Sequence, residues 1–91
     1  MEQLNIIKEL INKGDIVDAI NLLEVYVLNN STHLDKAFYL LGNAYRKQGN
    51  WQQTLNNYQR AIDLNPNSPA KEAHRMVMDI LNFYNKDMYN Q

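Results

Sequence analysis

LGNAYRKQGNW, residues 41–51, is the stretch of sequence that decides the fold, because one of its two glycines lies inside a helical pattern. Leu41, Ala44 and Tyr45 have the spacing of one helix face. Glycine in a helix interior costs about 1 kcal/mol relative to alanine. Gly42 therefore needs a structural reason, whereas Gly49 has the position of a glycine that ends a helix.

The apolar residues along the whole chain recur at helical spacing. They predict five helices, over residues 4–13, 16–29, 33–48, 51–64 and 69–88, and no segment alternates as a strand does. The connections are only a few residues long, so consecutive helices are expected to be antiparallel neighbours. The sequence predicts an all-α fold.

Polar residues at the expected helix starts support these boundaries. Thr32 with Asp35 fits a capping box, and Asn50 with Gln53 fits a second one. Asp15 and Ser68 are predicted caps of the second and fifth helices, and Pro69 follows Ser68 at the first helical position.

Composition narrows the class of protein. The 91 residues are 45% hydrophobic and 21% charged, with a net charge of -1 and no cysteine, which is typical of one soluble domain without disulfides. The sequence pI of about 6.0 argues against a nucleic-acid partner. The N-terminal segment has acidic residues and no long apolar run, so we expect a cytoplasmic protein without a signal peptide or membrane span.

The chain repeats itself with an offset of 35 residues. Gly14-Asp15-Ile16, followed by Ala19, recurs as Gly49-Asn50-Trp51, followed by Thr54. With this period, residues 35–68 resemble the tetratricopeptide repeat, a helix-turn-helix unit of 34 residues. The residues that carry the resemblance are Phe38, Leu41, Gly42, Tyr45, Thr54, Tyr58, Ala61 and Pro66.

The resemblance implies an antiparallel helix-hairpin solenoid formed by a single domain, residues 1–91. Repeat 1 is expected over about 1–34, repeat 2 over 35–68 and a capping helix over 69–88. In this family the glycine at position 42 allows the two helices of a repeat to approach closely, opposite a residue that here is Thr54. Ile7 and Ala19 would reverse that pairing in repeat 1. Tyr26 replaces a small residue between repeats, so either the junction is splayed or Tyr26 is rotated away.

The family binds peptides in a concave groove lined by the first helix of each repeat. Carried over position by position, the groove has four cations and no carboxylate, with apolar anchors between them, which predicts a partner protein or peptide that is acidic. The alternative is that the cations, Arg46 and Lys47 in particular, are solvated near a helix C-terminus. The predicted groove residues are Lys8, Lys36, Tyr39, Leu40, Asn43, Arg46, Lys47 and His74.

The fifth helix lacks the repeat signature, because Met76 stands where glycine would be. One of its sides is polar and the other apolar, as an end cap requires. Phe83, Tyr84 and Met88 are more apolar material than a cap needs, so self-association as a homodimer is the alternative function.

Catalytic and metal sites are not predicted. His33 and His74 are the only histidines and have no metal-ligand spacing. The candidate nucleophiles Ser31, Thr32 and Ser68 are better explained as caps. Trp51, like Tyr58, is expected in the core rather than on a stacking surface. The sequence thus predicts an interaction protein that is not an enzyme and has no cofactor.

Overall fold

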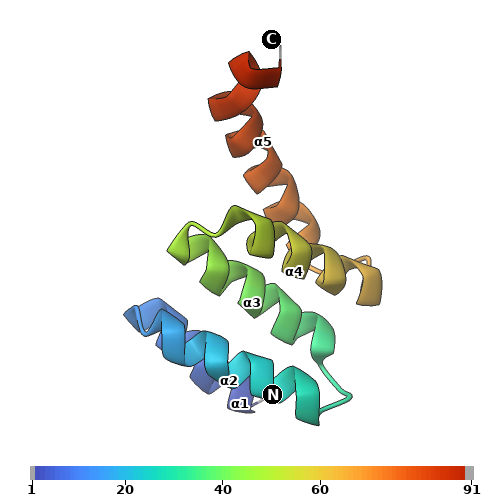
Figure 1. The fold of residues 1–91 in the computed structure, drawn as a ribbon. Coiled ribbons are helices and arrows are strands. Elements are labelled where there is room, and N and C mark those ends of the chain that lie inside the picture. Colours follow the sequence, from blue (N-terminus) through green and yellow to red (C-terminus); the bar gives the residue numbers. More distant parts are fainter. Residues whose placement is uncertain (1, 90–91) are drawn as a thin grey trace.

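The computed structural model describes residues 2–89, with side chains up to Phe83, and consists of five helices with no strand in that range (Figure 1). The all-α prediction is confirmed. The helices are α1 (Glu2–Lys13), α2 (Ile16–Asn29), α3 (Leu34–Gln48), α4 (Trp51–Leu64) and α5 (Ala70–Tyr89).

The helices stack in chain order, as in a helix-hairpin solenoid. In Figure 1 the α1–α2 hairpin lies at one end, the α3–α4 hairpin follows, and α5 leaves α4 and projects from the stack. The molecule is correspondingly elongated, with extents of 46 × 28 × 18 Å.

Two apolar clusters hold the stack together. The larger one joins α1, α2 and α3, and the smaller one joins α4 to α5. Phe38 packs against both clusters and so connects them. Each helix is therefore buried mainly against its neighbours, as expected for a repeat architecture. The fully buried side chains include Leu4, Leu23, Leu41, Tyr58 and Val77.

Gly42 of α3 lies directly against the Tyr58 ring of α4. A Cβ atom there would lie closer than 3.0 Å to two ring carbons of Tyr58 and 3.1 Å from a third. The close approach expected at Gly42 is present, but the atoms nearest to it belong to Tyr58 rather than Thr54. Thr54 is buried, and its hydroxyl donates to the carbonyl of Asn50 at 2.8 Å. The buried hydroxyl of Thr54 therefore has a hydrogen-bond partner at the start of its own helix.

The predicted caps are correct at α4 and α5. The Asn50 side chain accepts a hydrogen bond from the Gln53 amide at 3.2 Å, and the Ser68 hydroxyl accepts one from the Ala70 amide at 3.0 Å. Asp15 occupies the cap position of α2, although its side chain makes no capping hydrogen bond.

The capping box predicted at Thr32 and Asp35 is wrong. His33 is the residue before α3, in a left-handed conformation with φ of 57°. Thr32 instead offers its carbonyl oxygen to the Tyr26 hydroxyl at 3.1 Å. Tyr26 itself is buried, which shows that it packs at the junction between the hairpins instead of turning away.

Trp51 is a second correction, because 36% of its surface is exposed although it was expected in the core. It is the first residue of α4, two residues after Gly49, which ends α3. Tyr58, two turns later, is fully buried as expected.

Candidate functional site

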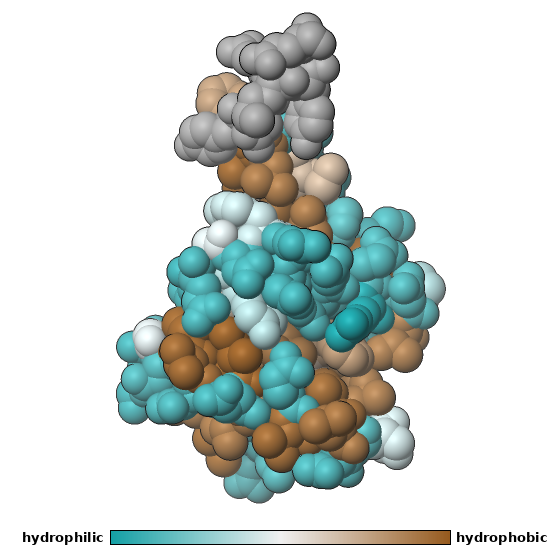
Figure 2. Space-filling view, viewed as in Figure 1, coloured by the Kyte–Doolittle hydropathy of each residue, from teal (hydrophilic) through white to brown (hydrophobic). Residues whose placement is uncertain are grey.

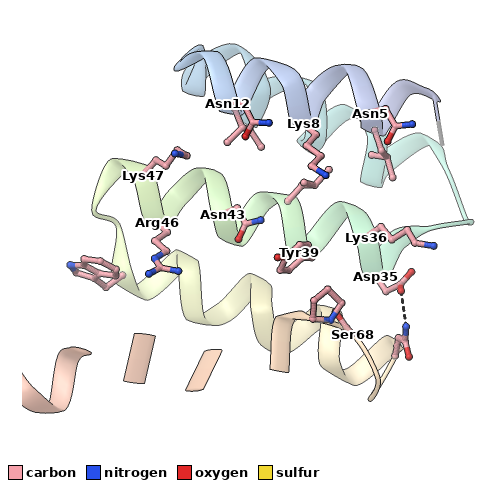
Figure 3. A pocket seen from close by; sticks show the side chains of 16 residues that line it. Asn5, Lys8, Asn12, Asp35, Lys36, Tyr39, Asn43, Arg46, Lys47 and Ser68 are labelled. Carbon is pink, nitrogen blue, oxygen red and sulfur yellow. Dashed lines mark hydrogen bonds between the residues drawn. The ribbon is translucent and has the colours of Figure 1, made fainter. Parts of the chain in front are cut away.

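A groove of about 670 Å³ runs along α3, between α1 and the connection from α4 to α5 (Figure 3). Its apolar surface comes from Leu4, Ile11, Tyr39, Leu40 and Trp51. Asn5, Lys8 and Asn12 of α1 face the side chains of α3 across it.

Seven of the eight residues predicted for the groove line it. They are Lys8, Lys36, Tyr39, Leu40, Asn43, Arg46 and Lys47. His74 is not among the lining residues, because α5 packs on α4 through Ala70 and Val77 and does not extend the wall of the groove. Ser68 and Pro69, just before α5, line this end instead.

The groove is basic but not free of carboxylates. Lys8, Lys36, Arg46 and Lys47 are joined by Asp35, which the sequence had not placed there. An oxygen of Asp35 accepts a hydrogen bond from the Asn65 side chain at 3.0 Å, shown dashed in Figure 3. Four cations against one carboxylate leave an excess of positive charge in the groove.

The side chain of Asn43 is oriented by Tyr58. The Tyr58 hydroxyl donates to Oδ1 of Asn43, and the Tyr58 ring lies 5.9 Å from that of Tyr39 at an angle of 30°. In Figure 3 Asn43 lies on α3, between Arg46 and Tyr39 along the groove. Because Oδ1 is engaged, the Nδ2 group is the part of Asn43 that can donate to a ligand. The same ring that packs on Gly42 therefore also positions a groove side chain.

Burial raises the pKa of Tyr58 above its ordinary value of 10.0, although Arg46 opposes the shift. Since the folded state holds this proton more tightly, the contribution of Tyr58 to stability is complete below pH 10 and declines as the pH rises above it. We expect Tyr58→Phe to lower stability at pH 7 by about 1 kcal/mol, the usual net value of one hydrogen bond. Its loss of stability above pH 10 should be shallower than that of the wild type.

Chemical denaturation of both proteins at pH 7 and at a series of pH values above 10 measures this. Tyr26→Phe is the control for loss of one tyrosine hydrogen bond, since the Tyr26 hydroxyl donates to the Thr32 carbonyl at 3.1 Å. Parallel alkaline curves for wild type and Tyr58→Phe would contradict the assignment.

Trp51 also lines the groove, although the sequence interpretation assigned it to the core. It has the spacing of the buried stripe of α4, with Thr54 and Tyr58 three and seven residues later. However, Trp51 is the first residue of α4 and is 36% exposed. The one signal in the sequence that could have indicated this exposure was the position of Trp51 at the start of its helix, directly after the turn that contains Gly49.

The part of the chain that the structure describes contains no cluster of three or more histidine, aspartate or glutamate side chains arranged for a metal ion. None of the helices in this part combines the length and the apolar character needed to cross a membrane.

Helix hairpins stacked around a concave groove define the class of the molecule as a helical-repeat protein. The profile of the tetratricopeptide repeat matches residues 35–68. A Bacteroides fragilis protein solved in solution by NMR is 64% identical to the chain, with a TM-score of 0.90, and the match covers 100% of this chain and 92% of that one. No curated protein matches the chain. The chain belongs to the tetratricopeptide repeat family, whose domains generally mediate interactions between proteins and are typically not catalytic.

Proposed function

We propose that this protein is an adaptor whose groove binds an acidic peptide segment of another protein. The observation that carries the proposal is the joint lining of one groove by Lys8, Lys36, Arg46 and Lys47 around an apolar surface. Lysine and arginine form their stronger hydrogen bonds with carboxylates, so acidic side chains of a ligand would be recognised.

Asn43 gives the groove a means of holding peptide backbone. Its Nδ2 group is available to a ligand carbonyl because Tyr58 holds its oxygen. The apolar side chains of Tyr39 and Trp51 would take up apolar residues of the ligand between its carboxylates. A peptide that alternates acidic and apolar residues fits this lining.

The adaptor would perform no reaction and need no cofactor, and it would act in the cytoplasm. Asp35 has the one carboxylate among the residues that line the groove, and this carboxylate already accepts a hydrogen bond from the Asn65 side chain. Binding of nucleic acid is disfavoured by the net charge of -1, since nucleic-acid-binding domains usually carry an excess of positive charge.

The first test compares wild type with Arg46→Glu/Lys47→Glu in binding a synthetic peptide of alternating glutamate and leucine, followed by fluorescence of Trp51. We expect the double substitution to weaken binding at least tenfold, because it removes two attractions and adds two repulsions. Exposed pairs are worth up to about 1 kcal/mol each, and about 1.4 kcal/mol is tenfold. Wild-type affinity should also fall with added salt.

Lys13→Glu/Lys71→Glu is the matched control, because both lysines are exposed and lie outside the groove lining. Equal weakening by both double variants would indicate a general charge effect and overturn the groove assignment. A pull-down from native cell lysate with the same three proteins would then name a partner that only the groove variant loses.

Self-association through α5 is the alternative, and exposed apolar side chains favour it. Met76, Met78 and Phe83 are 44%, 38% and 70% exposed. Tyr84 and Met88, the other predicted residues, lie outside the described side chains. Light scattering of the same samples separates the two functions: a mass that rises with concentration and falls in Phe83→Asp would support self-association.

A further inference from the structure

The charged side chains of the groove come mainly from one helix. Figure 2 shows apolar colour over much of α1 and α2 and mostly hydrophilic colour over α3 and α4. Three of the four groove cations, Lys36, Arg46 and Lys47, belong to α3, and so does Asp35. The order of these residues along α3 therefore sets how charge is distributed along the groove.

This distribution is uneven. Figure 3 shows Arg46 and Lys47 toward the C-terminal end of α3, Asp35 and Lys36 at its N-terminal end, and Lys8 of α1 between them. Among the lining residues, the C-terminal end thus has two cations and no carboxylate, whereas the N-terminal end has one of each. The attraction for acidic side chains of a ligand is concentrated at the end of Arg46 and Lys47.

The carboxylate of Asp35 is only partly used within the protein. Its Oδ2 accepts the hydrogen bond from the Asn65 side chain at 3.0 Å, whereas its Oδ1 has no hydrogen-bond partner among the residues that the structure describes. Within the same residues Asp35 forms no ion pair, even with Lys36, because adjacent residues of a helix do not face each other. Since Asp35 is half-buried in the groove lining, its Oδ1 can accept a hydrogen bond from a ligand and would repel a ligand carboxylate.

One short segment can reach both ends of the groove. The twelve residues from Asp35 to Lys47 span about 18 Å at about 1.5 Å per helical residue. An extended peptide advances about 3.3 Å per residue, so about five or six residues cover this length. Between the ends, Tyr39 and Leu40 supply apolar surface for the middle of the segment.

We propose that the groove distinguishes the two ends of its ligand, with carboxylates at Arg46 and Lys47 and an uncharged hydrogen-bond donor, such as glutamine, asparagine or serine, at Asp35. A cationic donor would be repelled by Lys36 beside Asp35, which favours an uncharged one. The inference rests on the proposed function and narrows its ligand to a segment that is acidic at one end only. Asp35 is the residue that excludes acidic side chains from the other end.

The test uses two synthetic peptides with blocked termini, both consisting of two glutamates, leucine, serine and leucine, followed by glutamine in the first and glutamate in the second. Binding is followed by the fluorescence of Trp51. We expect the first peptide to bind the wild type about threefold or more tightly than the second, the ratio of one repulsion as large as a typical exposed ion pair. Asp35→Asn should abolish this preference by strengthening the second peptide.

The position of each peptide end is a second readout. A nitroxide attached beside the two glutamates should broaden the amide NMR signals of residues 46–51 most strongly, and one attached beside the glutamine should broaden those of residues 35–36 and 65–68. This comparison does not depend on the direction in which the peptide chain runs.

Asp18→Asn is the matched control, because it removes one exposed carboxylate outside the groove lining and should leave the preference unchanged. Equal binding of the two peptides to the wild type, a preference that survives Asp35→Asn, or the same broadening from both nitroxides would overturn this inference and leave the acidic-peptide adaptor standing. Binding of neither peptide would overturn both.

Discussion

Gly42→Leu is expected to destabilise the α3–α4 hairpin, with a net loss of about 2 kcal/mol or more and a clear drop in helical circular dichroism. A Cβ at this position would already lie too close to two ring carbons of Tyr58, and the remaining leucine atoms extend the overlap. Overpacking in a core usually costs about 1 to 3 kcal/mol. The gain in helix propensity returns only about 1 kcal/mol. Thermal and chemical denaturation measure the difference.

Two comparisons separate a steric clash from a general effect of substitution. Gln48→Leu, at an exposed position of the same helix, should change stability by less than about 0.5 kcal/mol. In a Tyr58→Ala background the cost of Gly42→Leu should fall by more than half, because the ring that it meets is gone. An additive double variant would show that Gly42 does not act through Tyr58.

Val77→Asp is expected to detach α5 from α4 and to cost about 3 kcal/mol or more. Val77 is fully buried in the cluster that holds Tyr58, Ala61 and Ala70 together. A carboxylate there would be desolvated in an apolar cluster and would face no partner, which is among the costliest single changes in a protein. Helix packing against α4 supplies most of the stability of α5, so its helical signal should decrease as well.

Met78→Asp is the matched control, since Met78 is the next residue of the same helix and is 38% exposed. Its cost should stay below about 1 kcal/mol. If Val77→Asp and Met78→Asp had equal effects on the denaturation midpoint and on circular dichroism, the docking of α5 through this side would be contradicted. The ion pairs of Arg75 with Glu72 and with Asp79 lie on the exposed side of α5 and should persist in both variants.

Some features of the groove could be predicted because they depend on positions along one helix. Lys36, Asn43 and Lys47 follow α3 at helical spacing, so their common direction was evident from the sequence. Asp35 was missed because the sequence paired it with Thr32 in a capping box. Its hydrogen-bond partner in the structure is Asn65, which is thirty residues away in the sequence. A contact between residues so far apart in the sequence depends on how α3 and α4 pack together.

Trp51 and His74 illustrate the same limit at the ends of helices. A helical period assigns a residue to a face, but whether that face is covered depends on where the neighbouring helix stops. Trp51 has the spacing of the apolar face of α4 and still lines the groove, at the first position of its helix. His74 was expected in the groove wall, yet α5 packs on α4 and His74 does not line the groove.

The amino-acid sequence by itself determined the five helices, their antiparallel order, and membership of a repeat family, because helical period, turn glycines and short connections are local properties. Only the tertiary structure decided that Tyr58 both packs on Gly42 and orients Asn43, and that Asp35 and Asn65 meet at one end of a basic groove. These features arise between helices. Their distances and exposure follow from how the helices pack, which no single period along the chain specifies.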